Sequence, residues 1–193
     1  MSLAALQWLE VLAVILAVLY LLLAIRQNIW CWAAAAVSTL LYLYIMYRAG
    51  LYMESALQVF YLAMAAYGWY EWRYGGTGHG ELKVSTWPLR YHVAAVAGVA
   101  LLMLASGTLL SRYTSASLPF ADSFTTWGAV VATFMVARKI LENWFYWFVI
   151  DAVSIGLYLN RDLHFTAALF GLYLVMIVFG YRAWRASMYE DAP

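Results

Sequence analysis

The chain has 193 residues, of which 66% are hydrophobic and only 11% are charged, and its formal net charge is +1. Soluble domains have roughly 45–50% apolar and about 25% charged residues, so this composition excludes an ordinary soluble domain and predicts an integral membrane protein. The nearly neutral charge gives no indication of nucleic-acid binding. The single cysteine, Cys31, excludes a disulfide framework.

Seven apolar stretches follow one another along the chain, and most approach the roughly 20 residues that are needed to cross the hydrocarbon of a bilayer. They predict helices over residues 6–25, 29–47, 55–72, 93–110, 123–137, 143–159 and 165–184. The first stretch is not predicted to be a cleaved signal, because no Lys or Arg precedes it and its apolar run is too long. We therefore predict an all-α membrane protein with seven transmembrane helices.

The basic residues divide unequally between the two sides of such a bundle. One side holds Arg26, Arg73, Lys83, Arg90, Arg138, Lys139, Arg182 and Arg185, and the other holds Arg48, Arg112 and Arg161. Because cytoplasmic loops carry the excess of Lys and Arg, the amino terminus is predicted to lie outside and the carboxyl terminus in the cytoplasm.

The chain matches itself without a gap when it is shifted by 112 residues. The segment GWYEWR at 68–73 falls on GYRAWR at 180–185, and Trp32, Tyr61 and Arg26 fall on Trp144, Tyr173 and Arg138. An odd number of spans separates the two copies, so both run the same way through the membrane, as in transporters with parallel repeats. We predict a single transmembrane domain over 1–193, with repeat one at 6–73, a linker helix at 91–110 and repeat two at 120–185.

A polar segment with Gly75, Gly76, Gly78 and Gly80 precedes the linker helix. It lacks the G-x-x-x-x-G-K-[ST] pattern of a phosphate-binding loop, and we interpret it as a flexible linker.

The strongest candidate for a functional residue is Asp151, the ninth residue of the apolar stretch 143–160. A carboxylate near the bilayer midplane costs roughly 2.5–3.5 kcal/mol on insertion scales, so it should face the protein interior or water. Trp144, Trp147, Ser154 and Tyr158 share its helix face at steps of 3 and 4 residues. This face suits a flat, polar, cationic solute, and the alternative is a structural pair between Asp151 and an arginine.

The third span has a similar stripe, in which Glu54, Gln58, Tyr61 and Ala65 follow one another at steps of 4, 3 and 4 residues. An amide such as that of Gln58 needs partners inside a membrane, and helix–helix contact would satisfy it as well as a solute would.

Most tryptophans are interpreted as interfacial anchors, namely Trp30, Trp32, Trp69, Trp72, Trp87, Trp127 and Trp184. Trp147 lies deeper and is predicted to stack on a ligand, where a ring over a desolvated cation gains about 2 kcal/mol. There is no H-E-x-x-H or G-x-S-x-G motif, so nothing in the sequence points to an enzyme.

Three segments closely resemble the PnuC family of bacterial vitamin transporters, most of which carry nicotinamide riboside: LQVFY at 57–61, YGWYEW at 67–72 and RKILENWFYW at 138–147. The resemblance covers nearly the whole chain. It implies a SWEET-like arrangement of three, one and three helices, a homotrimer, and a place in the bacterial inner membrane. It also implies facilitated diffusion, with trapping of the vitamin by a separate cytoplasmic kinase and no cofactor or metal in the transporter.

The chain departs from this family at one position of the sixth span, where the common Trp-x-x-x-Asn is Trp147-x-x-x-Asp151. The predicted substrate is nicotinamide riboside, with thiamine, carried by relatives of the family, as the alternative. A non-transporting receptor or scaffold is the competing class. The predicted site has Trp147 and Trp144 stacking on the ring, Asp151 balancing its charge, Gln58 and Asn143 as hydrogen-bond partners, and Tyr61 and Tyr173 closing the pocket. Trp32 and Ser154 complete the predicted set.

Overall fold

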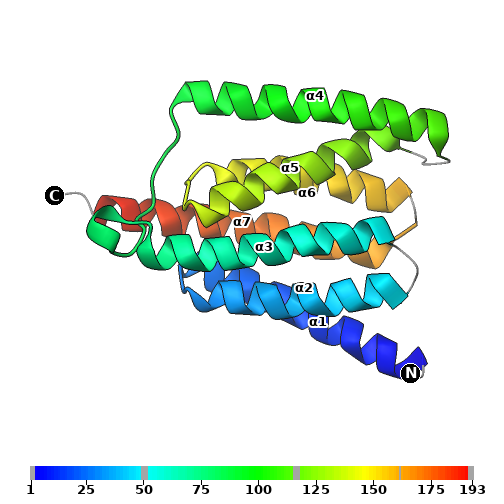
Figure 1. Ribbon diagram of the computed structural model, residues 1–193, viewed down its shortest axis with the longest axis horizontal. Coiled ribbons are helices and arrows are strands. Elements are labelled where there is room, and N and C mark those ends of the chain that lie inside the picture. Colours follow the sequence, from blue (N-terminus) through cyan, green and yellow to red (C-terminus); the bar gives the residue numbers. More distant parts are fainter. Residues whose placement is uncertain (1–2, 49–51, 115–117, 161, 191–193) are drawn as a thin grey trace. The chain divides into compact units, whose positions relative to one another are not determined.

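A computed structural model of the chain describes residues 3–48, 52–114, 118–160 and 162–190. The described residues form seven α-helices and one 3-10 turn (Figure 1). The helices are α1 (Leu3–Ile25), α2 (Trp30–Arg48), α3 (Tyr52–Tyr74), α4 (Leu89–Tyr113), α5 (Pro119–Ala137), α6 (Asn143–Asn160) and α7 (His164–Glu190). Each predicted span corresponds to one of these helices in the predicted order, and only the second begins outside its helix, one residue before Trp30. The all-α, seven-helix fold is therefore confirmed.

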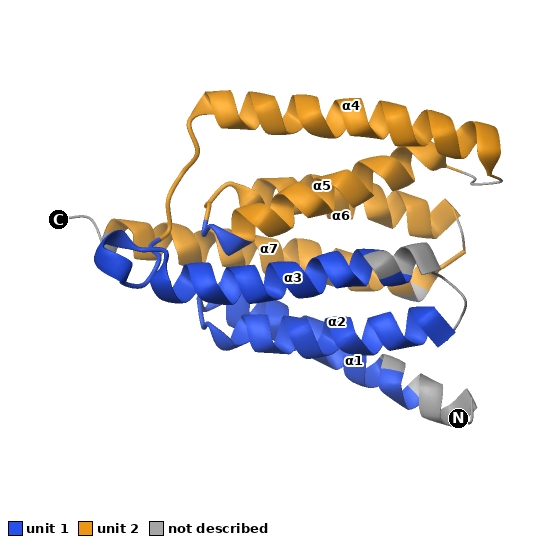
Figure 2. Ribbon diagram, in the orientation of Figure 1, with its two compact units in different colours: residues 1–83, 137–139 blue, residues 84–136, 140–193 orange. Residues whose placement is uncertain are grey.

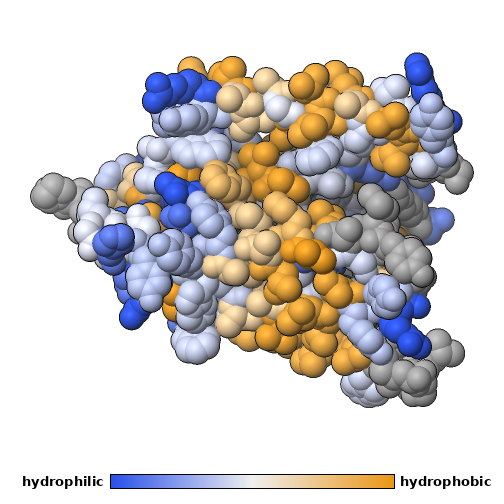
Figure 3. Space-filling model, in the orientation of Figure 1, coloured by the Kyte–Doolittle hydropathy of each residue, from blue (hydrophilic) through white to orange (hydrophobic). Residues whose placement is uncertain are grey.

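The surface of the helices suits a bilayer. By length and composition, four segments among the described residues could each cross a membrane: Trp30–Arg48, Leu89–Tyr113, Pro119–Ala137 and Thr166–Tyr189. On the face in view in Figure 3, hydrophobic residues cover the middle of the helices and hydrophilic residues gather towards their ends. This distribution is expected when the middle of each helix contacts hydrocarbon and its ends contact water.

The chain divides into two compact units (Figure 2). The first contains residues 1–83 and, from the turn between α5 and α6, residues 137–139; the second contains residues 84–136 and 140–193. In the first unit α2 packs against both α1 and α3, and in the second α6 packs against α7. In the second unit, Trp127 of α5 also donates a hydrogen bond from Nε1 to Ser106 Oγ of α4, at 3.1 Å. The single domain and the repeat boundaries stay predictions.

Both units are held together by the same tryptophan packing. In the first unit the Trp32 ring meets the Trp72 ring edge to face, with centroids 5.5 Å apart, and covers the backbone of Gly68. In the second unit Trp144 and Trp184 meet in the same way at 5.4 Å, over Gly180. A Cβ atom on either glycine would overlap the indole, so only glycine allows this approach. These positions are all related by the shift of 112 residues.

This packing corrects the interpretation of three tryptophans as interfacial anchors. Trp32, Trp72 and Trp184 are buried inside their units, whereas Trp30 is 62% exposed, as expected of an anchor. The position of a tryptophan near a span end does not reveal which way its ring points. Four residues before Trp72 and Trp184 lie Gly68 and Gly180, which leave room for the rings of Trp32 and Trp144.

The glycine-rich segment after α3 forms a turn. It folds back through the 3-10 turn Thr77–His79, and the Gly76 amide donates a hydrogen bond to the Gly80 carbonyl at 3.0 Å. A Cβ atom at Gly76 would overlap the carbonyl oxygens of Gly80 and Glu81, and Gly78 has a φ of 68°. These glycines therefore serve a compact turn, and the flexibility of the segment stays a prediction.

Candidate functional site

The polar face predicted for the sixth span is buried in the structure. Asp151 is 4% exposed, and Ser154 one turn later and Asn143 at the start of α6 are buried as well. Trp147, one turn before Asp151, is half-buried. The burial follows the 3- and 4-residue steps of a helix, so these side chains line the inward face of α6 in the second unit.

No hydrogen bond or ion pair joins Asp151 to another side chain in the part of the chain that the structure describes. The arginine pair that the sequence left open is therefore not formed among these residues. A buried carboxylate is costly unless a positive charge or hydrogen-bond donors compensate it. The Asp151 carboxylate thus has its acceptor capacity available for a solute that carries either.

Two neighbouring residues at the start of α6 also have polar atoms that lack partners among the described residues. The Asn143 amide donates from Nδ2 to the Ile140 carbonyl at 2.6 Å, which leaves Oδ1 without a donor. The Trp144 Nε1 atom is buried without an acceptor, and so is the equivalent atom of Trp32 in the first unit. Buried polar atoms are usually hydrogen-bonded, so these three are candidates for contact with a polar solute or water.

The structure places the nine predicted site residues in two sets. Trp32, Gln58 and Tyr61 lie in the first unit, and Asn143, Trp144, Trp147, Asp151, Ser154 and Tyr173 lie in the second. Gln58 and Tyr61 are half-buried on α3. The faces of Trp32 and Trp144 are occupied by helix packing, so their indole nitrogens rather than their ring faces are available. The role of all nine in binding stays a prediction.

Tyr173 belongs to an aromatic cluster that joins α6 to α7. Its ring lies 5.4 Å from that of Phe170, which in turn lies 5.0 Å from that of Tyr158. Tyr158 lies on the helix face that was predicted to point inward, whereas Phe170 was not among the predicted residues. The step of three residues between Phe170 and Tyr173 is the signal that could have found it.

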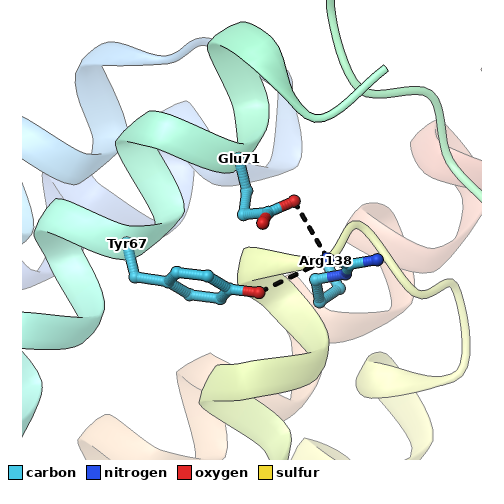
Figure 4. Close-up of polar contacts among 3 residues, drawn as sticks. All are labelled: Tyr67, Glu71 and Arg138. Atoms are coloured by element: carbon cyan, nitrogen blue, oxygen red, sulfur yellow. Dashed lines mark hydrogen bonds and ion pairs between the residues drawn. The ribbon is translucent and has the colours of Figure 1, made fainter. Parts of the chain in front are cut away.

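The turn between α5 and α6 makes several polar contacts that its charges and its family motif do not reveal. Within the first unit, Arg138 Nη1 lies 3.1 Å from Glu71 Oε2 and donates to the Tyr67 hydroxyl at 3.4 Å (Figure 4). Lys139 Nζ donates to Gln27 Oε1 at 3.2 Å and lies 4.6 Å above the Trp72 ring. The hydrogen bond to Tyr67 and the charge of Glu71 raise the pKa of Arg138, so this guanidinium stays charged.

The next residues of this turn are bonded within the second unit. Ile140 forms a parallel β-bridge with Ser85, and the Leu141 amide donates to the Ser85 carbonyl at 2.8 Å. The Trp87 amide donates to Glu142 Oε2 at 3.3 Å. These contacts hold the segment from Ile140 to Glu142 at the start of α6 within the second unit, and through it the position of the inward face.

Replacing Arg138 by Met is expected to destabilise the protein by about 1–3 kcal/mol, the cost of leaving a buried acceptor without its partner. The Glu71 side chain is only 12% exposed in this ion pair. The matched control is Arg73→Met, which removes an ion pair between side chains that are 57% and 78% exposed. Such surface pairs contribute about 0–1 kcal/mol. Melting curves in detergent measure both variants, and equal losses would mean that the Arg138 pair is no more important than a surface contact.

The seven apolar helices and their tryptophan packing are those of a multi-pass membrane protein, and a buried polar face runs along one of the helices. Residues 7–186 match the family model described as nicotinamide mononucleotide transporter, so the chain belongs to this family. The resemblance to PnuC vitamin transporters is thereby confirmed, and the family assignment replaces the receptor or scaffold class with that of a transporter.

Two curated relatives and one solved structure are similar over most of their lengths. The riboflavin/roseoflavin transporter RibM of Streptomyces davaonensis is 30% identical, with 96% of this chain and 88% of the relative covered. The nicotinamide riboside transporter PnuC of Escherichia coli (strain K12) is 24% identical with the same coverage. The crystal structure of the vitamin B3 transporter PnuC has a TM-score of 0.73 at 23% identity, covering 96% of this chain and 83% of that one, which supports the fold.

Proposed function

We propose that this protein takes up a cationic aromatic vitamin by facilitated diffusion, with nicotinamide riboside as the substrate. The observation that carries the proposal is the buried carboxylate of Asp151, which has no partner among the described side chains. Opposite charge is the most effective way to compensate such a group. The pyridinium ring of nicotinamide riboside is flat, aromatic and permanently positive, so it offers both the charge and a stacking surface.

The remaining polar groups of α6 fit the other parts of this molecule. Trp147 is half-buried one turn before Asp151 and is the ring that stacks on the pyridinium. The Asn143 Oδ1 and Trp144 Nε1 atoms, an acceptor and a donor without described partners, hydrogen-bond its amide or ribose groups. Ser154 lies one turn beyond Asp151 and adds a hydroxyl on the same face.

A second candidate is riboflavin, which the similarity to RibM favours. The flavin ring system is flat but uncharged, so it would stack on Trp147 without compensating Asp151. Thiamine, another aromatic cation, is the alternative within the charged class. The two cations would both be paired with Asp151, whereas riboflavin would not, so a direct comparison of uptake is needed to identify the substrate.

The proposal is tested by uptake of each radiolabelled vitamin into proteoliposomes that contain the purified protein. We expect nicotinamide riboside to equilibrate fastest, thiamine to compete with it, and riboflavin to compete weakly. Empty liposomes and liposomes with heat-denatured protein serve as controls. Preferential uptake of riboflavin would overturn the choice of substrate, and no uptake of any of the three would overturn the function.

Uptake is expected without an imposed proton or sodium gradient. A proton-coupled carrier usually shows a series of ionisable groups across the membrane. Asp151 is the one acidic residue deep in a predicted span, and the cation of the substrate occupies it. Counterflow of labelled vitamin at equal pH on both sides checks this expectation. Strict dependence on a pH gradient would instead identify Asp151 as a proton site.

We also propose an outside amino terminus, a cytoplasmic carboxyl terminus and a homotrimeric assembly. The orientation rests on eight basic residues against three on the two predicted sides. A reporter that fluoresces only in the cytoplasm, fused after Pro193, is expected to fluoresce. A dark but well-expressed fusion would reverse the topology, and light scattering of the purified protein would measure the subunit number.

A further inference from the structure

The side-chain amide of Asn143 has a fixed orientation at the start of α6. Asn143 is 0% exposed, and its Nδ2 atom donates a hydrogen bond to the Ile140 carbonyl at 2.6 Å. If the amide were turned over, Oδ1 would face that carbonyl oxygen, and two acceptors cannot form a hydrogen bond. Ile140 is itself held in place by its β-bridge with Ser85. The side chain therefore presents Oδ1, an acceptor, to an incoming group.

This Oδ1 atom has no donor among the described residues. A buried oxygen of this kind usually has a partner, which is a protein group, a water molecule or a ligand. Because an amide oxygen accepts and cannot donate, the partner must carry an N–H or O–H group. A transporter of the alternating-access type encloses its solute between the two sides of the membrane, so burial is compatible with a solute contact.

The position of Asn143 on α6 relates this acceptor to the rest of the proposed site. Asn143, Trp147 and Asp151 follow one another at steps of four residues, so their side chains lie one above the other along the same face of the helix. Neighbours at this step have Cβ atoms about 5–6 Å apart. A flat ring stacked on Trp147 would therefore have the Asp151 carboxylate towards one side and the Asn143 acceptor towards the other.

We propose that Asn143 selects substrates whose aromatic ring bears an N–H donor, and that its Oδ1 atom accepts a hydrogen bond from the carboxamide of nicotinamide riboside. The inference rests on the proposed function and adds to it a chemical requirement on the ring substituent. Asp151 compensates the charge of the ring, whereas Asn143 binds the substituent. A substituent that has only acceptors would leave Oδ1 buried without a donor, which is costly.

Two ribosides that differ in this donor test the requirement on the unaltered protein. In acetylpyridine riboside a methyl ketone replaces the carboxamide, so the carbonyl group and the charge of the ring are kept and the N–H donor is lost. We expect the acetyl analogue to bind about tenfold more weakly in calorimetry, which corresponds to about 1.4 kcal/mol. Asp151 cannot cause this difference, because both ligands carry the same charge.

Asn143→Leu and a matched control assign the preference to this side chain. Asn143→Leu removes the acceptor, so the ratio of the two affinities should fall from about tenfold to nearly one. The control is Asn160→Leu, the same change at the exposed end of α6, which should keep the preference. The ratio within one variant is the readout, because a loss of folded protein lowers the binding of both ligands alike.

The outcomes separate this inference from the function on which it rests. Equal binding of the two ribosides by the unaltered protein would overturn the role of Asn143, whatever the variants show, and would leave Oδ1 to a buried water molecule. A preference that persists in Asn143→Leu would also overturn it and assign the donor contact to another residue. Binding of neither riboside would overturn the proposed function together with this inference.

Discussion

Gly180→Ala is expected to lower the melting temperature of the protein sharply. The new Cβ atom would overlap the Trp144 ring, which cannot retreat because Trp184 packs against it edge to face. Forcing an extra carbon into such a packed site costs about 1–3 kcal/mol or more. Gly68→Ala should have the same effect in the first unit, where the overlap is with Trp32.

The matched control lies on the same helix. Gly171 of α7 has no atom within 4 Å of the position that a Cβ would take, so Gly171→Ala should stabilise the helix by up to about 1 kcal/mol. Replacing Trp144 by Leu in the Gly180→Ala background should recover part of the loss, since the overlapping ring is gone. If Gly180→Ala melts like Gly171→Ala, the tryptophan–glycine packing does not hold the second unit together.

Asp151→Asn is expected to weaken binding of nicotinamide riboside by about 10- to 100-fold. The change removes the negative charge and keeps the shape of the side chain, so the loss is that of a hydrogen bond to a charged group, about 1.5–3 kcal/mol. Thiamine should lose at least as much affinity, because Asn is the common residue in relatives that carry the riboside. Folding should be preserved or improved, since an amide costs less to bury than a carboxylate. Calorimetry with each vitamin, beside a melting curve, measures both effects.

An exposed aspartate provides the control for this change. Asp162 lies in the turn after α6 with a φ of 57°, a conformation that Asn adopts readily, so Asp162→Asn should leave binding and melting unchanged. Riboflavin binding should be little affected by Asp151→Asn, because the flavin carries no cation. Unchanged affinity for all three vitamins would remove Asp151 from the site. Lower stability with equal losses for every vitamin would make it a structural residue.

The order and type of the helices could be predicted because each apolar stretch is long and bounded by polar residues. The start of α6 at Asn143 was predicted correctly, since the charged turn before it ends abruptly. The end of α7 was placed six residues early, at Trp184 instead of Glu190. Hydropathy marks where a chain leaves hydrocarbon, whereas a helix continues into water as long as its residues permit it.

The inward face of α6 could be predicted because the polar and aromatic residues around Asp151 follow one another at steps of 3 and 4 residues, which places them on one side of a helix. What escaped prediction depends on contacts between distant parts of the chain. Arg138 meets Glu71 across 67 residues, and Ile140 pairs with Ser85 across the start of α4. A single sequence shows the charges and the apolar residues, but it does not show which of them meet. For the same reason it could not distinguish buried tryptophans from anchors.

The assignment of Ala137–Lys139 to the first unit has a consequence for the predicted internal repeat. Gln27 and Lys139 occupy positions related by the shift of 112 residues, and both have a positive φ, of 52° and 48°. Lys139 nevertheless donates a hydrogen bond that Gln27 accepts. A half-length polypeptide that assembled in pairs would carry the same residue at both positions and could not form this bond as it stands. A fragment made of residues 1–83 alone would lack the cation that meets Gln27 and the guanidinium that meets Glu71. The two predicted repeats are therefore complementary, rather than identical, at this pair of positions.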